Sequence, residues 1–193
     1  MNSGRRTIEA QTRRWAKHVN EHDVGTSSSF ANMERLLRRE YYGRFLIELI
    51  QNARDAWFSA NHSRTDRGVL RVVLHGSPPV LTICNQGAAL DANGLFKYIA
   101  QFGESSKRAG QGIGHKGIGF KSVLEITRCP QIFSRHAQEG AFDLRVGFDP
   151  ERTERLIDEV SAPLSWKGLV GKLEDGEAAQ IERLPILRFP HWQ

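Results

Sequence analysis

Apolar residues recur at helical spacing in the stretch that follows Gly43. They form a broad face whose members are Phe45, Leu46, Leu49, Ile50, Ala53, Ala56 and Trp57. This pattern predicts an amphipathic helix. A second helical stretch starts at Phe30, and Gly43 is expected to divide the two. Residues 5–20 predict another helix that is too polar to form much core, and the segment GTSSS from Gly25 to Ser29 predicts the break that follows it.

Short runs rich in valine, isoleucine and leucine predict strands in the middle of the chain. Val69 to His75 and Val80 to Asn85, joined by the segment GSPP, predict a β-hairpin. PQIFSR and AFDLRVGF predict a further strand pair, and ERTERLIDEV predicts a helix. Asp91 is placed to cap a helix through LFKYIA. Helices first and strands interleaved with helices afterwards predict an α/β sandwich with a mainly antiparallel sheet covered on one face.

Bulk properties narrow the class of protein. At 193 residues the chain is long enough for one domain with a real core. No run approaches the roughly 20 apolar residues needed to cross a bilayer, and the N-terminus has no apolar signal segment. The two cysteines have no CxxC spacing. These features predict a soluble, reduced, cytoplasmic protein without membrane partners.

The net charge of +5 is concentrated near the N-terminus. Residues 1–44 hold nine Arg and Lys against five Asp and Glu, whereas the remaining residues are nearly balanced. We expect residues 1–30 to be a basic helical arm attached to a domain at 31–193. The arm is either a solvated helix face or a polyanion-binding segment that favours nucleic acid.

Three polar side chains share one face of the predicted helix after Gly43. Glu48, Asn52 and Asp55 are spaced i, i+4, i+7, so a helix presents them on one side. One interpretation is a solvent-facing polar stripe. The other is a metal–phosphate site, because Mg²⁺ takes hard oxygen ligands, a few from protein and the rest from phosphates and water. Asn52 could then supply a neutral oxygen, and Glu48 could deprotonate a water that attacks a γ-phosphate.

A glycine-dense loop, GQGIGHKGIGFKSV, runs from Gly110 to Val123. Its glycines fit GxGxxG, but no strand precedes them, so the loop fails the context of a dinucleotide fold. Phe120 stands where a P-loop needs lysine. The residues from Gln101 to Gly119 predict a mobile loop that acts as a lid.

General physics still makes this loop a candidate anion site. Glycine lets the backbone approach an anion closely, and a helix beginning near Gly119 offers free N–H groups. The lysines of the segment are expected to add cations; they are Lys107, Lys116 and Lys121.

The two segments together resemble a known family. ELIQNARDA is similar to the N-box of the GHKL ATPases, and GIGHKGIGFKSV resembles their second glycine box. The segment KGIGFKSV, with GESSK before it and PQIFS after it, is most similar to the sacsin and NO VEIN branch of this family. The resemblance is dense from about Phe45 to Ser134, with a weaker echo at LPILRFPHW.

The resemblance implies a Bergerat-type two-layer sandwich that binds ATP and Mg²⁺. Glu48 matches the glutamate that activates water, and Asn52 matches the asparagine that holds Mg²⁺. The implied ATP-binding set is Asn52, Asp55, Asn85, Gly87, Ser106, Lys107, Gly114, Lys116, Gly117, Ile118, Gly119 and Phe120.

Two departures from the family pattern stand out. The first glycine box usually reads Asp-x-Gly-x-Gly, but here it is Asn85-Gln86-Gly87-Ala88-Ala89, which keeps the polarity and loses the charge. The chain also stops soon after LPILRFPHW, whereas related domains continue through further strands, so we expect a C-terminally incomplete piece of a longer protein.

The resemblance implies slow, Mg²⁺-dependent ATP hydrolysis that drives lid closure and homodimerisation in a larger chaperone-like or regulatory protein. In chaperone-like members of the superfamily an N-terminal segment crosses to the neighbouring protomer, so the basic arm at residues 1–30 is expected to serve this assembly in preference to binding nucleic acid. The alternatives are a nucleotide-gated binding module that does not hydrolyse ATP, and a nucleic-acid-associated ATPase. Retention of Glu48 favours the first, since a module that only binds needs no base there.

Overall fold

The computed structural model of the chain describes residues 3–22, 24–60, 63, 65–100, 119–136, 142–160 and 184–193. Three helices come first, and the remaining elements alternate between strands and short helices. The helices are α1 (Ser3–His22), α2 (Val24–Glu40), α3 (Phe45–Ser59), α4 (Ala92–Leu95) with the π-helical turn η1 (Phe96–Ala100), the 3₁₀ helix η2 (Gly119–Glu125) and α5 (Pro150–Val160). The strands are β1 (Leu70–His75), β2 (Val80–Asn85), β3 (Gln131–Ser134), β4 (Leu144–Phe148) and β5 (Pro190–Trp192).

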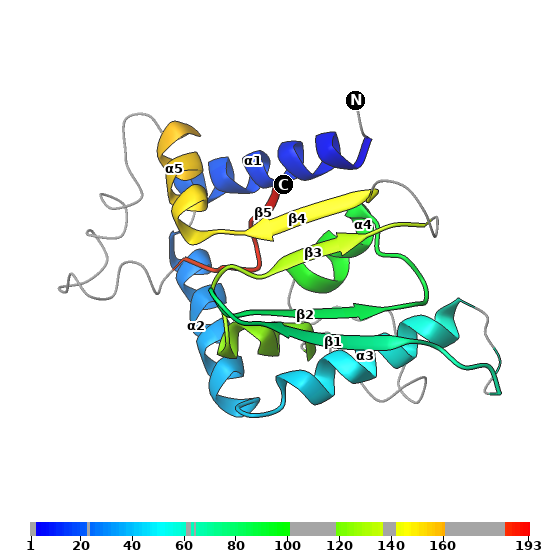
Figure 1. Cartoon of the computed structure of the whole chain (residues 1–193). Helices are drawn as coiled ribbons and strands as arrows, with labels where there is room; N and C mark the ends of the chain where they lie inside the picture. Colours follow the sequence, from blue (N-terminus) through cyan, green and yellow to red (C-terminus); the bar gives the residue numbers. More distant parts are fainter. Residues whose placement is uncertain are drawn as a thin grey trace.

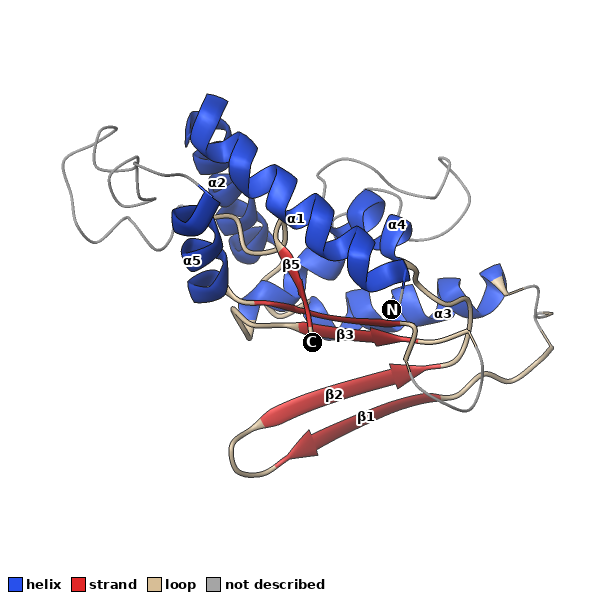
Figure 2. Cartoon of the chain, turned by 90° about the horizontal axis from the view of Figure 1, so that it is seen from above, coloured by secondary structure: helices blue, strands red, loops and turns tan. Residues whose placement is uncertain are grey.

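The strands form a layer with the helices gathered on one of its faces (Figures 1 and 2). β1 pairs with β2, and β4 pairs with both β3 and β5; every one of these pairings is antiparallel. β2 and β3 are not joined by a strand ladder, and the Leu90 amide donates to Ser134 Oγ at 2.8 Å in the chain that follows β2. The prediction of an α/β architecture with an antiparallel sheet and helices on one face is therefore confirmed, with the sheet divided in two.

The hydrophobic core lies between β3–β5 and the helices above them. Its larger cluster draws on α1, η1, η2, β4 and the C-terminal segment; the fully enclosed members are Ile8, Leu95, Leu124, Leu144, Val146, Phe148 and Leu187. A second cluster joins α1 to α5 through Ala16, Val19 and Ile157, together with Leu184 and Phe189. Among the described residues, no helix combines the length and apolar character that crossing a bilayer requires.

The N-terminal helix is part of this core, and the prediction that it is too polar to contribute is wrong. Ile8, Thr12, Ala16 and Val19 of α1 are at most 5% exposed. Their spacing of four, four and three residues places them on one helical face. That face packs against α5 and β5, where Thr12 Oγ1 donates to the Pro190 carbonyl at 2.7 Å. The helix is polar on average because its other side carries the exposed basic residues.

The predicted break at Gly25–Ser29 is also wrong, because these residues lie in the first turns of α2. Small hydroxyl residues favour a helix start as readily as a loop, and Ser27 is buried against the rest of the protein. Two other predictions are confirmed. Gly43 separates α2 from α3 with φ of +74°, and the Asp91 carboxylate accepts the Gly94 amide as the N-cap of α4.

Candidate functional site

Helix α3 turns its polar stripe toward the protein and part of its apolar face toward solvent. Glu48 is 8% exposed, and the Asp55 side chain is 14% exposed. Leu46, Ile47 and Ile50 are 36%, 52% and 41% exposed. An amphipathic helix ordinarily does the reverse. The interpretation of Glu48, Asn52 and Asp55 as a solvent-facing stripe therefore does not hold.

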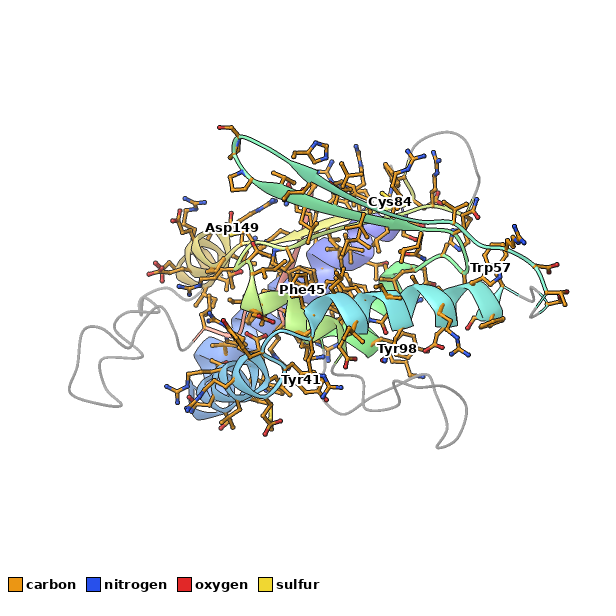
Figure 3. All side chains as sticks on the ribbon, turned by 60° about the horizontal axis from the view of Figure 1, so that its bottom comes forward. Tyr41, Phe45, Trp57, Cys84, Tyr98 and Asp149 are labelled. Carbon is orange, nitrogen blue, oxygen red and sulfur yellow. The ribbon has the colours of Figure 1, made fainter. Side chains whose placement is uncertain are left out.

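The start of α3 is held by backbone geometry and by η2. Gly43 adopts a left-handed conformation that lets the chain turn between α2 and α3. Its amide donates to Glu125 Oε1 at 2.9 Å, which ties the turn to the end of η2. Figure 3 shows α3 running beneath the β1–β2 hairpin, from Phe45 at its start to Trp57 near its end. This placement brings the polar stripe to the first residue of η2.

Gly119 begins η2 and meets the candidate base directly. A Cβ atom built on Gly119 would lie 2.8 Å from Glu48 Oε2 and 3.7 Å from Asn52 Nδ2. Real Cβ atoms do not approach other atoms that closely, so a side chain at position 119 would push the Glu48 carboxylate out of this position, whereas glycine leaves it in place. The structure thus brings α3 together with Gly119, the last glycine of the glycine-dense segment that the sequence analysis paired with this helix.

The turn after β2, which carries Gly87, packs on the other end of the same helix. Gly87 has φ of +133°, and a Cβ there would lie 2.5–2.6 Å from the main chain of Ala56 and Trp57. The neighbouring Ala88 amide donates to the Ala56 carbonyl at 2.8 Å. Helix α3 therefore contacts one glycine turn near Glu48 and the other at Ala56, one residue beyond Asp55.

Asn85 lies at the end of β2 with an exposed side chain. Its Nδ2 donates to the Gln86 carbonyl at 3.1 Å, which directs the amide nitrogen to the local backbone. The Gln86 side chain accepts the Val69 amide at 3.1 Å and so closes the end of the hairpin. Asn85 and Gly87 are thus presented together on the turn that docks on α3.

Arg44 is a residue of this site that the sequence analysis did not identify. Its Nη2 lies 3.8 Å from Glu48 Oε1, one helical turn away, and its side chain is 59% exposed. The i, i+4 spacing was a usable signal. The pKa of Tyr41 is raised above its usual value, first by burial and then by the nearby Glu48 carboxylate. The charge of Glu48 therefore acts on the residue that follows α2.

Lys121 is not the loop cation that the sequence predicted. Its side chain is 1% exposed and lies in the interior, where Glu34 is its electrostatic partner. Phe120 is partly buried and packs against the main core cluster, so its side chain anchors η2 while its backbone stays beside Gly119. Consecutive residues of a helix point in different directions, so Lys121 can face the interior although it directly follows the glycine-dense loop in the sequence.

Several predicted binding residues lie outside the described residues. They are Ser106, Lys107, Gly114, Lys116, Gly117 and Ile118, together with the rest of the predicted lid before Gly119. The structure therefore brings together Glu48, Asn52 and Gly119, and separately Gly87 with the end of α3.

The donor set suits magnesium better than a metal held by protein alone. Within the described part of the chain, no group of three or more His, Cys, Asp or Glu side chains is placed to hold a metal ion. Mg²⁺ commonly takes only one or two protein ligands and completes its shell with phosphate and water oxygens. Asn52, beside the Glu48 carboxylate and a glycine turn, fits that pattern.

Comparison with known proteins finds one relevant similarity. The chain is 30% identical over 102 residues to Protein NO VEIN of Arabidopsis thaliana, and the match covers 51% of this chain. The chain corresponds to only 4% of the length of that plant protein. No protein-family model matches the sequence, and no solved structure matches the fold.

Proposed function

We propose that this chain is a GHKL-type nucleotide-binding domain that binds ATP with Mg²⁺ and hydrolyses it slowly. The observation that carries the proposal is the contact between Glu48 on α3 and Gly119 at the start of η2, 71 residues later in the sequence. A buried carboxylate beside a glycine turn and a carboxamide has no packing role that an apolar residue would not fill better. The similarity to Protein NO VEIN supports the choice of family.

Each residue has a role in this proposal. Asn52 gives its amide oxygen to Mg²⁺, which when bound neutralises charge on the β- and γ-phosphates. Glu48 accepts a proton from the attacking water. The Gly119 and Phe120 amides at the start of η2 face the phosphates, where side chains would block the approach. Asn85 keeps its oxygen for the amino group of adenine, since its nitrogen is engaged with Gln86.

Metal-dependent binding is the first test. Asn52→Ala should remove the part of the ATP affinity that depends on Mg²⁺, because it deletes the protein ligand and leaves the glycine turns intact. Calorimetry with a non-hydrolysable ATP analogue, with and without Mg²⁺, measures this. Gln51→Ala, one residue earlier on the same helix, is the matched control and should keep the metal dependence. Identical affinities in all conditions would rule the proposal out.

Turnover is the second test. Glu48→Gln keeps the size of the side chain and removes the base, so the variant should bind the nucleotide and hydrolyse it ~10²–10⁴-fold more slowly than the wild type. The exposed Glu40→Gln on α2 is the control. Phosphate release measured under single-turnover conditions decides the matter. Wild-type rates in the Glu48→Gln variant would assign the chemistry to another group.

A non-hydrolysing, nucleotide-gated module is a second candidate, and the ion pair of Glu48 with Arg44 favours it. The Arg44 guanidinium lies 3.8 Å from one Glu48 oxygen and so competes with an attacking water for that oxygen. Arg44→Gln distinguishes the two candidates. It should raise turnover if the pair restrains the base, and should leave a binding-only module inactive.

A third candidate, association with nucleic acid, is favoured by an open hollow of about 490 Å³ between α1 and α5. Arg13, Arg14 and Lys17 line it together with Glu159. Cations grouped this way attract phosphates in a salt-dependent manner. Salt-sensitive binding of DNA or RNA that Arg14→Gln and Lys17→Gln abolish would support this role; ATP-dependent dimerisation without such binding would favour assembly.

A further inference from the structure

Glu34 is a buried carboxylate that the proposed chemistry does not use. It lies on α2, is 4% exposed, and accepts two backbone hydrogen bonds from the C-terminal segment. Ile186 N donates to Oε2 at 2.6 Å, and Leu187 N donates to Oε1 at 2.8 Å. Burial raises the pKa of Glu34 to about 7, against the lowering effects of the two amides, Lys121 and Arg38. One side chain thus caps two consecutive amides that lie 152 and 153 residues away.

Lys121 is the charge that Glu34 meets from η2. It is 1% exposed, and burial lowers its pKa to about 8, with Glu34 acting in the opposite direction. Its neighbour Ser122 is also buried, and Ser122 Oγ donates to the Gly119 carbonyl at 2.6 Å. This hydrogen bond connects the buried part of η2 to Gly119. A Cβ atom on Gly119 would point at the Glu48 carboxylate.

These contacts form a continuous path through the molecule. Hydrogen bonds join the Ile186 and Leu187 amides to Glu34 on α2, and α2 packs against η2. The helix η2 carries the buried Lys121 and begins at Gly119, which touches Glu48. Helices α2 and α3 both pack against η2. Removing the charge pair would free η2 to shift relative to α3, which carries the proposed base.

We propose that Glu34 and Lys121 are positioning residues that hold the Gly119 turn against Glu48 and make that position depend on the docked C-terminal segment. This inference rests on the proposed nucleotide site for its functional consequence. The physical link between the C-terminal segment and η2 stands independently of it.

A pair of this kind is poorly explained as a stabilising device alone. Taking two charges out of water costs as much as their attraction returns, and apolar replacements of similar volume are often equally stable. Other charged groups are close: Arg38 acts on Glu34, and Arg35 and Arg128 line the small hollow of about 30 Å³ beside it. These arginines lie at the rim, whereas Lys121 alone among the described residues approaches from η2.

The test uses a double variant that removes both charges and keeps a hydrogen-bond acceptor for the two amides. Single changes leave one buried charge without its partner and can unfold the chain, so Glu34→Gln with Lys121→Met is the informative combination, because the glutamine oxygen can still accept from the Ile186 and Leu187 amides. Hydrogen exchange of the peptide covering η2, and of the Ile186 and Leu187 amides, should accelerate by about tenfold or more in this variant, as expected when local opening becomes easier. Glu40→Gln, exposed on the same helix, should leave both unchanged. Unaltered exchange at η2 in the folded double variant would overturn the proposal.

Nucleotide binding provides a second readout that a purely structural role would not change. Loss of positioning should weaken the affinity for an ATP analogue by about tenfold or more at unchanged stoichiometry, because small displacements in such sites are costly. A merely less stable protein would instead show fewer competent sites of unchanged affinity, and that result contradicts the proposal. If the wild type binds no nucleotide, the proposed function fails, while the exchange experiment still decides whether Glu34 and Lys121 hold η2.

Discussion

The two ends of the strand layer differ sharply in how they are packed. The packed region comprises α1, α5, β3–β5 and the C-terminal segment; β4 buries four of its five residues and β5 all three. The site region comprises α3 and the β1–β2 hairpin. Neither strand of the hairpin has a buried residue, and α3 buries only Glu48 and Ala53.

This difference separates stability from the candidate chemistry. A two-stranded hairpin is marginal by itself, and its apolar residues Leu70, Val72 and Leu74 are 37%, 45% and 73% exposed. The packed region therefore supplies the free energy that keeps the chain folded. The site region touches it through η2, and segments with few buried apolar contacts open most easily. A site that must admit a nucleotide benefits from lying at that end.

The largest expected effect contrasts one side chain from each region. Phe148→Ala on β4 removes a ring that is 1% exposed and should lower the free energy of unfolding by ~3–5 kcal/mol. Leu74→Ala on β1 should change it by less than about 0.5 kcal/mol, because the side chain is largely in solvent. Urea unfolding followed by circular dichroism measures both. Equal losses of unfolding free energy would mean that the hairpin is packed in solution, which would contradict the difference between the two regions.

Acid should weaken the packed region selectively through His191. Burial, and then the Arg152 charge, lower the pKa of His191 to about 4 from 6.5. Between these values unfolding takes up a proton at His191, so the His191 contribution to stability is complete above pH 6.5 and is lost as the pH approaches 4. The loss reaches at most ~3 kcal/mol. Glu34, whose pKa burial raises from 4.5 to about 7, acts in the opposite direction over its own range, so the His191 contribution is read as the difference between the wild type and a His191 variant.

His191→Gln should remove this acid slope, because glutamine does not titrate. His75→Gln, in the exposed hairpin, is the matched control from the site region and should retain it. Unfolding free energies measured from pH 7.5 to pH 4 compare the two variants. A slope that survives in His191→Gln would assign the acid sensitivity to other groups.

A smaller effect should separate two glycines at the ends of the hairpin. Gly87→Ala forces a side chain into a left-handed backbone and against the Ala56 main chain, which should cost ~1–3 kcal/mol and detach the turn from α3. Gly76→Ala, with no atom within 4 Å of the added Cβ, should be close to neutral. Thermal unfolding and calorimetry with Mg²⁺ and an ATP analogue should show both losses for Gly87→Ala alone. Preserved nucleotide affinity in that variant would remove the first glycine turn from the site.

The predictable parts of the fold were those set by local rules. The helix after Gly43, the hairpin and the Asp91 cap follow from periodicity and from turn chemistry over a few residues. The role of α1 was missed because its apolar face is narrow and includes Thr12, which is buried by bonding to Pro190. That partner lies 178 residues away, so the sequence around Thr12 contains no signal that identifies it.

The candidate site divides in the same way. Glu48, Asn52 and the glycine segments could be proposed from the sequence because helical spacing groups the two side chains and the segments resemble the GHKL boxes. The orientation of the polar stripe of α3 could not be predicted from the sequence, because a polar face can point either to solvent or to the interior. Lys121 was assigned to the loop for the same reason: its charge is visible in the sequence, and its direction is not.

The local elements and the α/β class were readable from the sequence, and the residues of the proposed magnesium–phosphate site could be named from it, because these depend on short-range backbone and side-chain chemistry. Tertiary structure decided that α3 faces inward, that Gly119 meets Glu48, and that Glu34 joins Lys121 to the C-terminal segment. Contacts of this kind depend on which surfaces remain when the core closes. Packing forms these contacts between residues that are far apart in the sequence.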